Sequence, residues 1–203
     1  AVSGKTTNTL FMEGQAGASD LFFGEFGEGN GYDKYVEIYN GSGGEIDLSQ
    51  YLMANQMNPS GAQTNDYTLK GWANFCRLAP TTTMLGHGET MLVLNGAPSG
   101  KIDPSMTNAL KNAVPPRPYV VTTNDVLTVS GDDPVALFRV TNTNQWIDAC
   151  GIGPSAARYI MRRLENAEVP RSFPRTVDPA QWDYRVWDGD RLSGYTNFLA
   201  TAG

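Results

Sequence analysis

The sequence has little of what a catalytic or metal centre needs. Among 203 residues it has one histidine and two cysteines, and only 18% of the residues are charged. A single histidine cannot build a multi-histidine zinc site. No Gly-x-x-x-x-Gly-Lys phosphate loop, Gly-x-Gly-x-x-Gly dinucleotide loop or Gly-x-Ser-x-Gly nucleophile elbow occurs. These absences argue against the enzyme classes that use those motifs.

Long apolar runs and positive charge are also scarce. No apolar run approaches the roughly 18 residues of a membrane-spanning helix. The 15 lysines and arginines are outnumbered by 21 aspartates and glutamates, so the formal net charge is −6. A protein that binds nucleic acid through the phosphates normally carries a basic face. We therefore expect neither a membrane span nor a nucleic-acid partner.

Turn residues between short β-prone runs are abundant. Glycine occurs 22 times, and Asn30-Gly31, Asn40-Gly41 and Asn95-Gly96 are strong signals for two-residue turns. In the run 34–39, aliphatic Val36 and Ile38 alternate with two tyrosines and a glutamate, so the glutamate shares a face with aromatic residues. The predicted strands are 21–26, 35–39, 51–54, 67–69, 91–95, 127–129, 135–140, 146–149 and 159–164.

One helix is predicted near the middle of the chain. Asp103 can cap its start, Pro104 suits the first helical position, and Pro115-Pro116 ends it. Many short strands with a single helix are typical of a two-sheet β-sandwich and not of alternating strand and helix units. The sequence therefore predicts an all-β fold.

Five segments, taken in order, resemble one known family. They are an acidic-ended strand with an E-I-Y-N strand and an I-D-L-S segment after it, a G-D-D-P-V-A-L run, a W-I-D strand, a strand ending in Arg-Arg, and a D-x-x-x-W ending. This order resembles bacterial lamin tail domains, including those attached to secreted nucleases. The segments are Asp20–Leu52, Leu127–Leu137, Gln145–Asp148, Tyr159–Arg163 and Asp178–Trp182.

The resemblance implies an immunoglobulin-like antiparallel β-sandwich with no catalytic centre of its own. It covers residues 20–203 as one domain, with one short helix and long loop insertions, and leaves residues 1–19 as an N-terminal extension. Gln50 stands where the family usually has glycine, and the loops 56–85 and 96–125 are longer than its common pattern. The first residue is alanine, which fits removal of a signal peptide, and an arbitrary start of the sequence fits equally well. We expect a secreted or cell-surface protein.

Two carboxylates and the histidine are the residues closest to catalytic candidates. Glu25 and Glu37 lie on adjacent predicted strands, and paired carboxylates perform acid–base chemistry when their environments differ. The alternative is that they bind backbone donors or pair with arginine at a strand end. His87 lies between two glycines in a predicted turn, where a surface role is expected. We predict no catalytic residue and no enzyme.

Clustered aspartates are weak candidates for calcium. Calcium takes six to eight oxygen ligands, often from loops. Asp132, Asp133, Asp188 and Asp190 offer such oxygens, but neither stretch has the twelve-residue EF-hand spacing. Turn chemistry explains Gly131-Asp132 without a metal. No other cofactor is predicted.

Cys76 and Cys150 are predicted to form a disulfide. Two cysteines in a chain expected to be secreted favour this pairing, and two buried free thiols are the alternative.

The N-terminal extension carries a β-prone run, Thr6–Met12, that could add to an open sheet edge of the same molecule or of a neighbour. Charge is uneven along the chain. Residues 1–60 hold two lysines and eight carboxylates, and residues 158–175 hold five arginines and two glutamates. These ends either neutralise each other within one fold or steer one copy onto the next. The candidate assembly residues are Thr9, Leu10, Phe11, Met12, Arg162 and Arg163.

Three functions remain open from the sequence. The first is a structural or interaction module that assembles with copies of itself or with another surface protein. The second is an accessory domain that places a secreted nuclease on its substrate. The third is a free-standing hydrolase, for which no motif is present.

Overall fold

The computed structural model describes seven segments of the chain, namely residues 19–28, 34–57, 69–96, 118–129, 133–150, 159–164 and 182–186. Strands dominate them, and the helices found within them are three-residue 3-10 turns, so the predicted all-β fold class is confirmed. No helix in these segments is long and apolar enough to cross a membrane. The predicted helix at 103–114 lies outside them.

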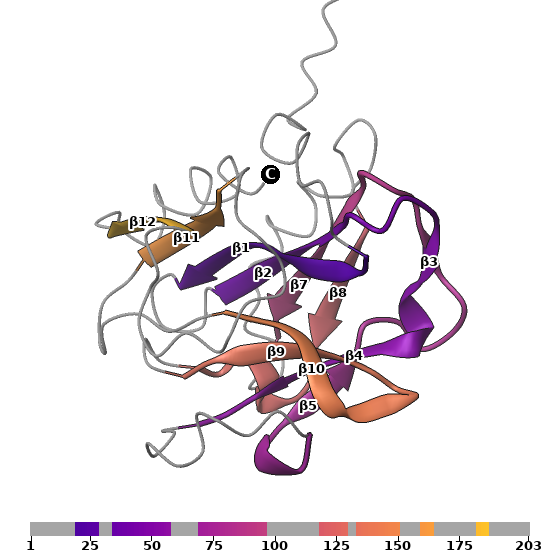
Figure 1. Cartoon of the computed structure of the whole chain (residues 1–203). Helices are drawn as coiled ribbons and strands as arrows, with labels where there is room; N and C mark the ends of the chain where they lie inside the picture. Colours follow the sequence, from indigo (N-terminus) through magenta and orange to yellow (C-terminus); the bar gives the residue numbers. More distant parts are fainter. Residues whose placement is uncertain are drawn as a thin grey trace, which may run out of the picture.

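The larger sheet has six strands in the order β12-β11-β1-β2-β7-β8 (Figure 1). Neighbouring strands run antiparallel except β7 and β8, which are parallel. The parallel pair departs from the antiparallel sheet that we expected. The strands are β1 (Leu21–Glu28), β2 (Lys34–Asn40), β7 (Thr90–Asn95), β8 (Tyr119–Thr122), β11 (Tyr159–Arg163) and β12 (Trp182–Val186).

The smaller sheet has four antiparallel strands in the order β10-β9-β4-β5, and β3 pairs with β6 beside it. These strands are β3 (Ile46–Asp47), β4 (Tyr51–Asn55), β5 (Phe75–Arg77), β6 (Met84–Leu85), β9 (Val135–Arg139) and β10 (Asn142–Cys150). The 3-10 turns are η1 (Leu48–Gln50), η3 (Leu69–Gly71) and η4 (Asp125–Leu127).

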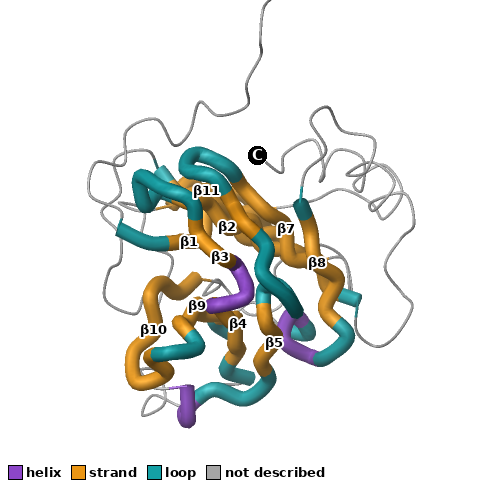
Figure 2. The backbone as a smooth tube through the Cα atoms, turned by 90° about the vertical axis from the view of Figure 1, so that its right-hand side faces the viewer, coloured by secondary structure: helices purple, strands orange, loops and turns teal. Residues whose placement is uncertain are grey.

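The main core lies between the two sheets, which form separate layers in Figures 1 and 2. One layer contributes residues such as Phe23, Ile38 and Val93, and the other contributes Met53 and Leu137. Burying such side chains supplies the main driving force for the fold. A second cluster covers the opposite face of the four-stranded sheet, where the rings of Trp72 and Phe138 meet edge to face at 5.8 Å. The architecture is sandwich-like.

Alternation along β2 works as the sequence predicts, but both faces are buried. Val36 and Ile38 enter the core between the sheets, while Tyr35, Glu37 and Tyr39 occupy the opposite face. β1 is buried at every position as well. Its pairing with β2 shifts register between Phe23 and Glu25, which marks a bulge at Gly24. The outward face of this sheet therefore holds buried polar side chains.

Seven of the twelve described strands were predicted, and four of the five missed strands have four residues or fewer. β1, β2, β4, β7, β9, β10 and β11 each contain or nearly match a predicted strand. The stretch 127–129 is not a strand, because Asn124 caps the 3-10 turn η4 by accepting a hydrogen bond from the Val126 N–H at 3.2 Å. Leu69 begins the 3-10 turn η3 instead of ending a strand. β3, β5, β6, β8 and β12 were not predicted.

Two Asn-Gly pairs end strands without making the expected hairpins. β2 pairs with β1 and β7, so Asn40-Gly41 opens the loop to β3, where Gly43 adopts the positive φ of +84° that favours glycine. Gly96 follows β7, and a Cβ atom there would lie 2.4 Å from the carbonyl oxygen of Thr122. Close approach to β8 explains that glycine. Asn30-Gly31 lies outside the described residues.

The predicted disulfide is wrong, because Cys76 and Cys150 are free thiols. Cys76 lies on β5 and Cys150 on β10, which are the two edges of the four-stranded sheet. Three strand spacings of about 4.8 Å put them roughly 14 Å apart, whereas a disulfide needs Cα atoms within about 7 Å. Both thiols border the main core, and burial raises the pKa of Cys76 to about 12 and that of Cys150 well above its usual value. The alternative of two free thiols is the one observed.

Candidate functional site

A row of charged residues crosses the outward face of the six-stranded sheet. Strand register sets Glu37 on β2 opposite Glu25 on β1, Glu25 opposite Arg162 on β11, and Arg162 opposite Asp183 on β12. The core residues on these strands point to the other face, so the row lies on one side of the sheet. The two glutamates that the sequence singled out are therefore cross-strand neighbours, with an arginine on the far side of Glu25.

Glu25 is bound on both of its oxygens. Tyr35 donates its hydroxyl to Oε1, and Arg162 Nε lies 2.5 Å from Oε2. The side chain of Glu25 is 2% exposed, while that of Arg162 keeps partial contact with solvent. Burial raises the pKa of Glu25 to about 7, against the opposing effect of the Arg162 charge and the Tyr35 hydroxyl, and Glu37 adds to the rise.

A carboxyl group with a pKa near neutrality is chemically suited to proton transfer. In Glu25, however, the two oxygens already hold Tyr35 and Arg162, which join β1 to its neighbours on both sides. This is the geometry of an ion pair that locks strands together, and ion pairs of this kind also perturb carboxyl pKa values. The arrangement favours the structural interpretation of Glu25 over the catalytic one.

A second buried ion pair joins the two sheets. Asp148 on β10 faces Arg163 on β11, with 2.5 Å between Asp148 Oδ2 and Arg163 Nη2. The same carboxylate oxygen accepts the Phe23 N–H at 2.8 Å, and Arg163 Nε donates to the Phe23 carbonyl at 2.8 Å. The guanidinium also lies over the Trp182 ring, 4.3 Å from its centroid. Three strands from two layers thus meet at one point.

The bulge at Gly24 explains why these side chains are needed. The pairing of β1 with β11 ends at Glu25 and Arg162, so it does not reach Phe23. A buried backbone group without a partner is costly, and here Asp148 and Arg163 take the place of the missing ladder. Burial raises the pKa of Asp148, while the Arg163 charge and the Phe23 N–H act in the opposite direction.

Arg162 and Arg163 therefore serve different faces of one strand. Arg162 binds Glu25 on the outward face, and Arg163, 1% exposed, binds Asp148 on the core side. The alternative that the two ends of the chain neutralise each other within one fold fits Arg162, whose partner Glu25 lies within residues 1–60. Arg163 instead pairs with Asp148, which lies outside that acidic stretch. As placed, Arg163 is a core residue. The other candidate assembly residues, 9–12, lie outside the described residues.

Two polar residues in the segments that resemble lamin tail domains form the hydrogen bonds of turns. The buried Asn40 side chain donates to the carbonyls of Gly44 and Leu85 at 2.8 and 2.7 Å and accepts the Ser42 N–H at 3.0 Å. Asp47 accepts the backbone N–H groups of Ser49 and Thr83 at 3.0 and 3.1 Å. These bonds lower the pKa of Asp47, the Thr83 bond most strongly. Both side chains build the fold and do not point to a ligand.

The remaining candidates are dispersed. Asp133 is buried, while Asp132, Asp188 and Asp190 lie outside the described residues. Across the segments that the structure describes, no three side chains of histidine, cysteine, aspartate or glutamate gather as metal ligands would. His87 accepts the Gly43 N–H at Nδ1, 3.1 Å away, which gives it a place in the turn.

Sequence reasoning missed several partners in these clusters. Asp148 was noted only as part of a strand, and Tyr35 only as part of an alternating face. Asp20 was also missed: it accepts the Tyr51 hydroxyl at 2.7 Å and pairs with Arg139 at 2.7 Å on the rim. A carboxylate within a predicted strand was the available signal for Asp148, but its partner lies 15 residues away on another sheet.

Comparison with known proteins leaves the family open. No family model matches the sequence, and no curated protein matches it. A solved structure of a DUF4876 family protein from Bacteroides thetaiotaomicron VPI-5482 is similar over 37% of this chain and 24% of its own, at 23% identity and a TM-score of 0.29. The chain thus spans about a quarter of that protein. The lamin-tail resemblance stays a prediction.

Proposed function

We propose that this chain is a non-catalytic structural module of the lamin-tail type, with an immunoglobulin-like sandwich, that assembles with copies of itself in a secreted or cell-surface setting. The observation that carries the non-catalytic part is the bonding of Glu25. Its carboxylate is the group best suited to acid–base chemistry, and both of its oxygens are held by Tyr35 and Arg162. Turnover of nuclease, protease or esterase substrates that Glu25→Gln or His87→Ala abolishes would overturn it.

The assembly part rests on the N-terminal segment. Thr6–Met12 is β-prone, and the lamin-tail pattern begins only at Asp20, so the sandwich does not require it. An extended segment that pairs with a sheet edge gains backbone hydrogen bonds, with side-chain pockets for specificity. Between different copies such a contact is head-to-tail, and it grows into a filament unless a ring closes.

Deleting residues 1–15 tests this role. Sedimentation velocity of the full chain and the deleted chain at matched concentrations gives their sizes, and circular dichroism reports whether the deleted chain still folds. The proposal expects a folded deleted chain that no longer assembles. The proposal is contradicted if the deleted chain assembles to the same extent as the full chain. It is also contradicted if the deleted chain unfolds, because the segment would then be an internal strand.

A further inference from the structure

β5 is an edge strand whose outer side is defined by its register with β4. The Leu78 N–H donates to the Tyr51 carbonyl at 3.1 Å, and the Asn55 N–H donates to the Asn74 carbonyl at 3.0 Å. Hydrogen-bonded pairs alternate along an antiparallel ladder, so Cys76 turns its backbone groups toward β4. The residues on either side, Phe75 and Arg77, turn theirs toward the open edge.

This open edge is only partly occupied. The Asn124 side chain donates to the Phe75 carbonyl at 2.5 Å, and Arg77 Nη1 donates to the Ser49 carbonyl at 3.1 Å. Within the described part of the chain, no backbone partner reaches the N–H of Phe75 or of Arg77 from that side. An edge of this kind is a template for pairing with another strand.

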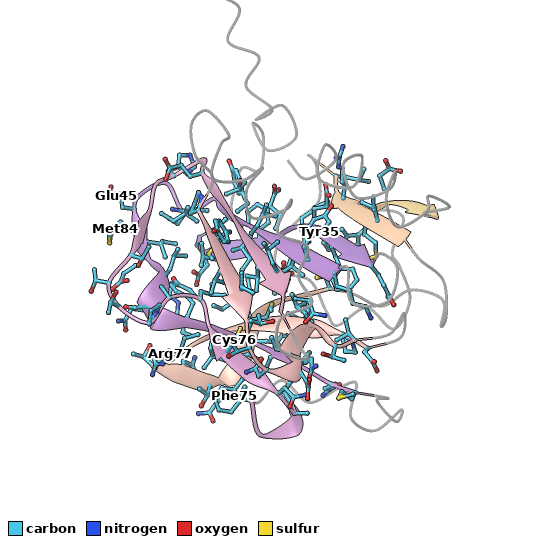
Figure 3. The ribbon with its side chains drawn as sticks, turned by 180° about the vertical axis from the view of Figure 1, so that it is seen from behind. Tyr35, Glu45, Phe75, Cys76, Arg77 and Met84 are labelled. Atoms are coloured by element: carbon cyan, nitrogen blue, oxygen red, sulfur yellow. The ribbon has the colours of Figure 1, made fainter. Side chains whose placement is uncertain are left out.

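The side chains make this edge unusual for a solvent-facing surface. Phe75 is 57% exposed. Arg77, two residues further along the strand, is exposed as well, and Figure 3 shows Phe75 and Arg77 at the border of the molecule. We refer to Phe75 and Arg77 as the β5 edge.

Two other edge strands, β10 and β8, are less suited to an incoming apolar strand. The exposed half of β10 carries Asn142, Asn144 and Gln145, which are polar. The side chains of β8 are half-buried or buried. The β5 edge therefore combines open backbone groups with exposed apolar surface, which marks interaction sites on protein surfaces.

We propose that the β5 edge receives residues 9–13 of a second copy as an added strand. This rests on the proposed function and names its acceptor. In an extended segment Phe11 and Glu13 share one face, as Phe75 and Arg77 do on β5. A parallel register that sets Phe11 beside Phe75 also sets Glu13 beside Arg77, so apolar contact and opposite charge coincide.

The opposite face of the incoming strand also finds suitable neighbours. Cys76 packs against the main core and is only partly buried. Leu10 and Met12, which alternate with Phe11, would lie on the same face as Cys76. The added strand thus places apolar residues on both faces of the sheet against apolar residues already there.

Photocross-linking in the full chain tests the contact directly. Phe11 is replaced by benzoylphenylalanine in chains with light or heavy nitrogen, which are mixed, irradiated and digested with trypsin. Cleavage after Lys70 and Arg77 isolates residues 71–77 as one peptide. The expected product joins position 11 of one isotope to residues 71–77 of the other. Links within one isotope only, or to other peptides only, overturn the proposal.

Matched variants separate this site from the proposed function. Phe75→Asp should raise the concentration needed for assembly by about tenfold or more, because a central aromatic contact is lost. Met84→Asp is the control, since Met84 is 49% exposed on β6, apart from Phe75 in Figure 3, and should assemble normally. Arg77→Glu should weaken assembly, and adding Glu13→Arg should restore it, which a misfolded chain would not do.

The outcomes divide the two proposals. Assembly that needs residues 1–15 but tolerates both Phe75→Asp and Arg77→Glu overturns the β5 edge as acceptor and leaves the proposed function in place. A full chain that stays monomeric at every concentration overturns both.

Discussion

Arg163 and Asp148 form a buried ion pair that bridges the two sheets, with 2.5 Å between Nη2 and Oδ2 and both side chains nearly free of solvent. The pair also binds the N–H and the carbonyl of Phe23 at the bulge of β1. The pair therefore connects three strands, β1, β10 and β11, across the two sheets.

Asp148→Asn should lower the free energy of unfolding by about 3–5 kcal/mol, because it leaves the Arg163 charge buried without its counterion. Urea unfolding followed by tryptophan fluorescence measures the change. Asp20→Asn is the control: its partner Arg139 is 48% exposed, and a solvent-exposed pair contributes about 0–1 kcal/mol. Equal losses of unfolding free energy in the two variants would show that the inter-sheet pair stabilises the fold no more than the exposed pair does.

Asn40→Ala should cost about 1–3 kcal/mol of stability. The Asn40 side chain donates to two carbonyls at the turn after β2, and its removal leaves buried polar groups without those bonds. Asn144→Ala on the exposed half of β10 is the matched control and should change stability little. Thermal unfolding of the two variants measures the difference. An unchanged melting temperature in Asn40→Ala would show that the Asn40 hydrogen bonds do not stabilise the fold.

Stability should depend on pH through Glu25. Its folded pKa, about 7, lies above the ordinary value of 4.5, so the folded state holds this proton more tightly than the unfolded state does. The stabilising contribution is full below about pH 4.5 and is lost as the pH rises through 7. Glu25→Gln should flatten the slope of unfolding free energy between these values. A slope that is the same in Glu25→Gln would place the titrating group elsewhere.

Both cysteines should titrate as free thiols. In denaturant without reductant we expect two thiols per chain, because the cysteines lie on opposite edges of one sheet. In the folded protein at pH 8 the reaction should be slow, since burial raises the pKa of both groups. Recovery of no thiol from the denatured chain would contradict the strand order of the four-stranded sheet.

Much of the fold was predictable because its long strands carry their own signal. Val36 and Ile38 alternate with polar and aromatic residues, and turn residues bound each run. Short strands lack that signal: β3 and β6 have two residues each, and they pair only because the rest of the chain brings Ile46 beside Leu85. The 3-10 turn at Asp125–Leu127 was missed because a local cap outweighed the β propensity of Val126 and Leu127.

The polar clusters were predictable only in part. Glu25 and Glu37 were identified together because both adjacent strands were recognised. The pairing of Asp148 with Arg163 depends on how the two sheets stack, which brings β10 of one sheet to β11 of the other, and the alternation pattern of either strand does not contain this information. The same limit produced the wrong disulfide, because composition suggested a bond that the strand order forbids.

The molar mass of the full chain in solution tests the central claim most directly. Multi-angle light scattering over a series of increasing concentrations should give a mass that rises above the 22.0 kDa of a single chain as copies assemble. A mass that stays at 22.0 kDa throughout the series would contradict the account of this chain as a self-assembling module.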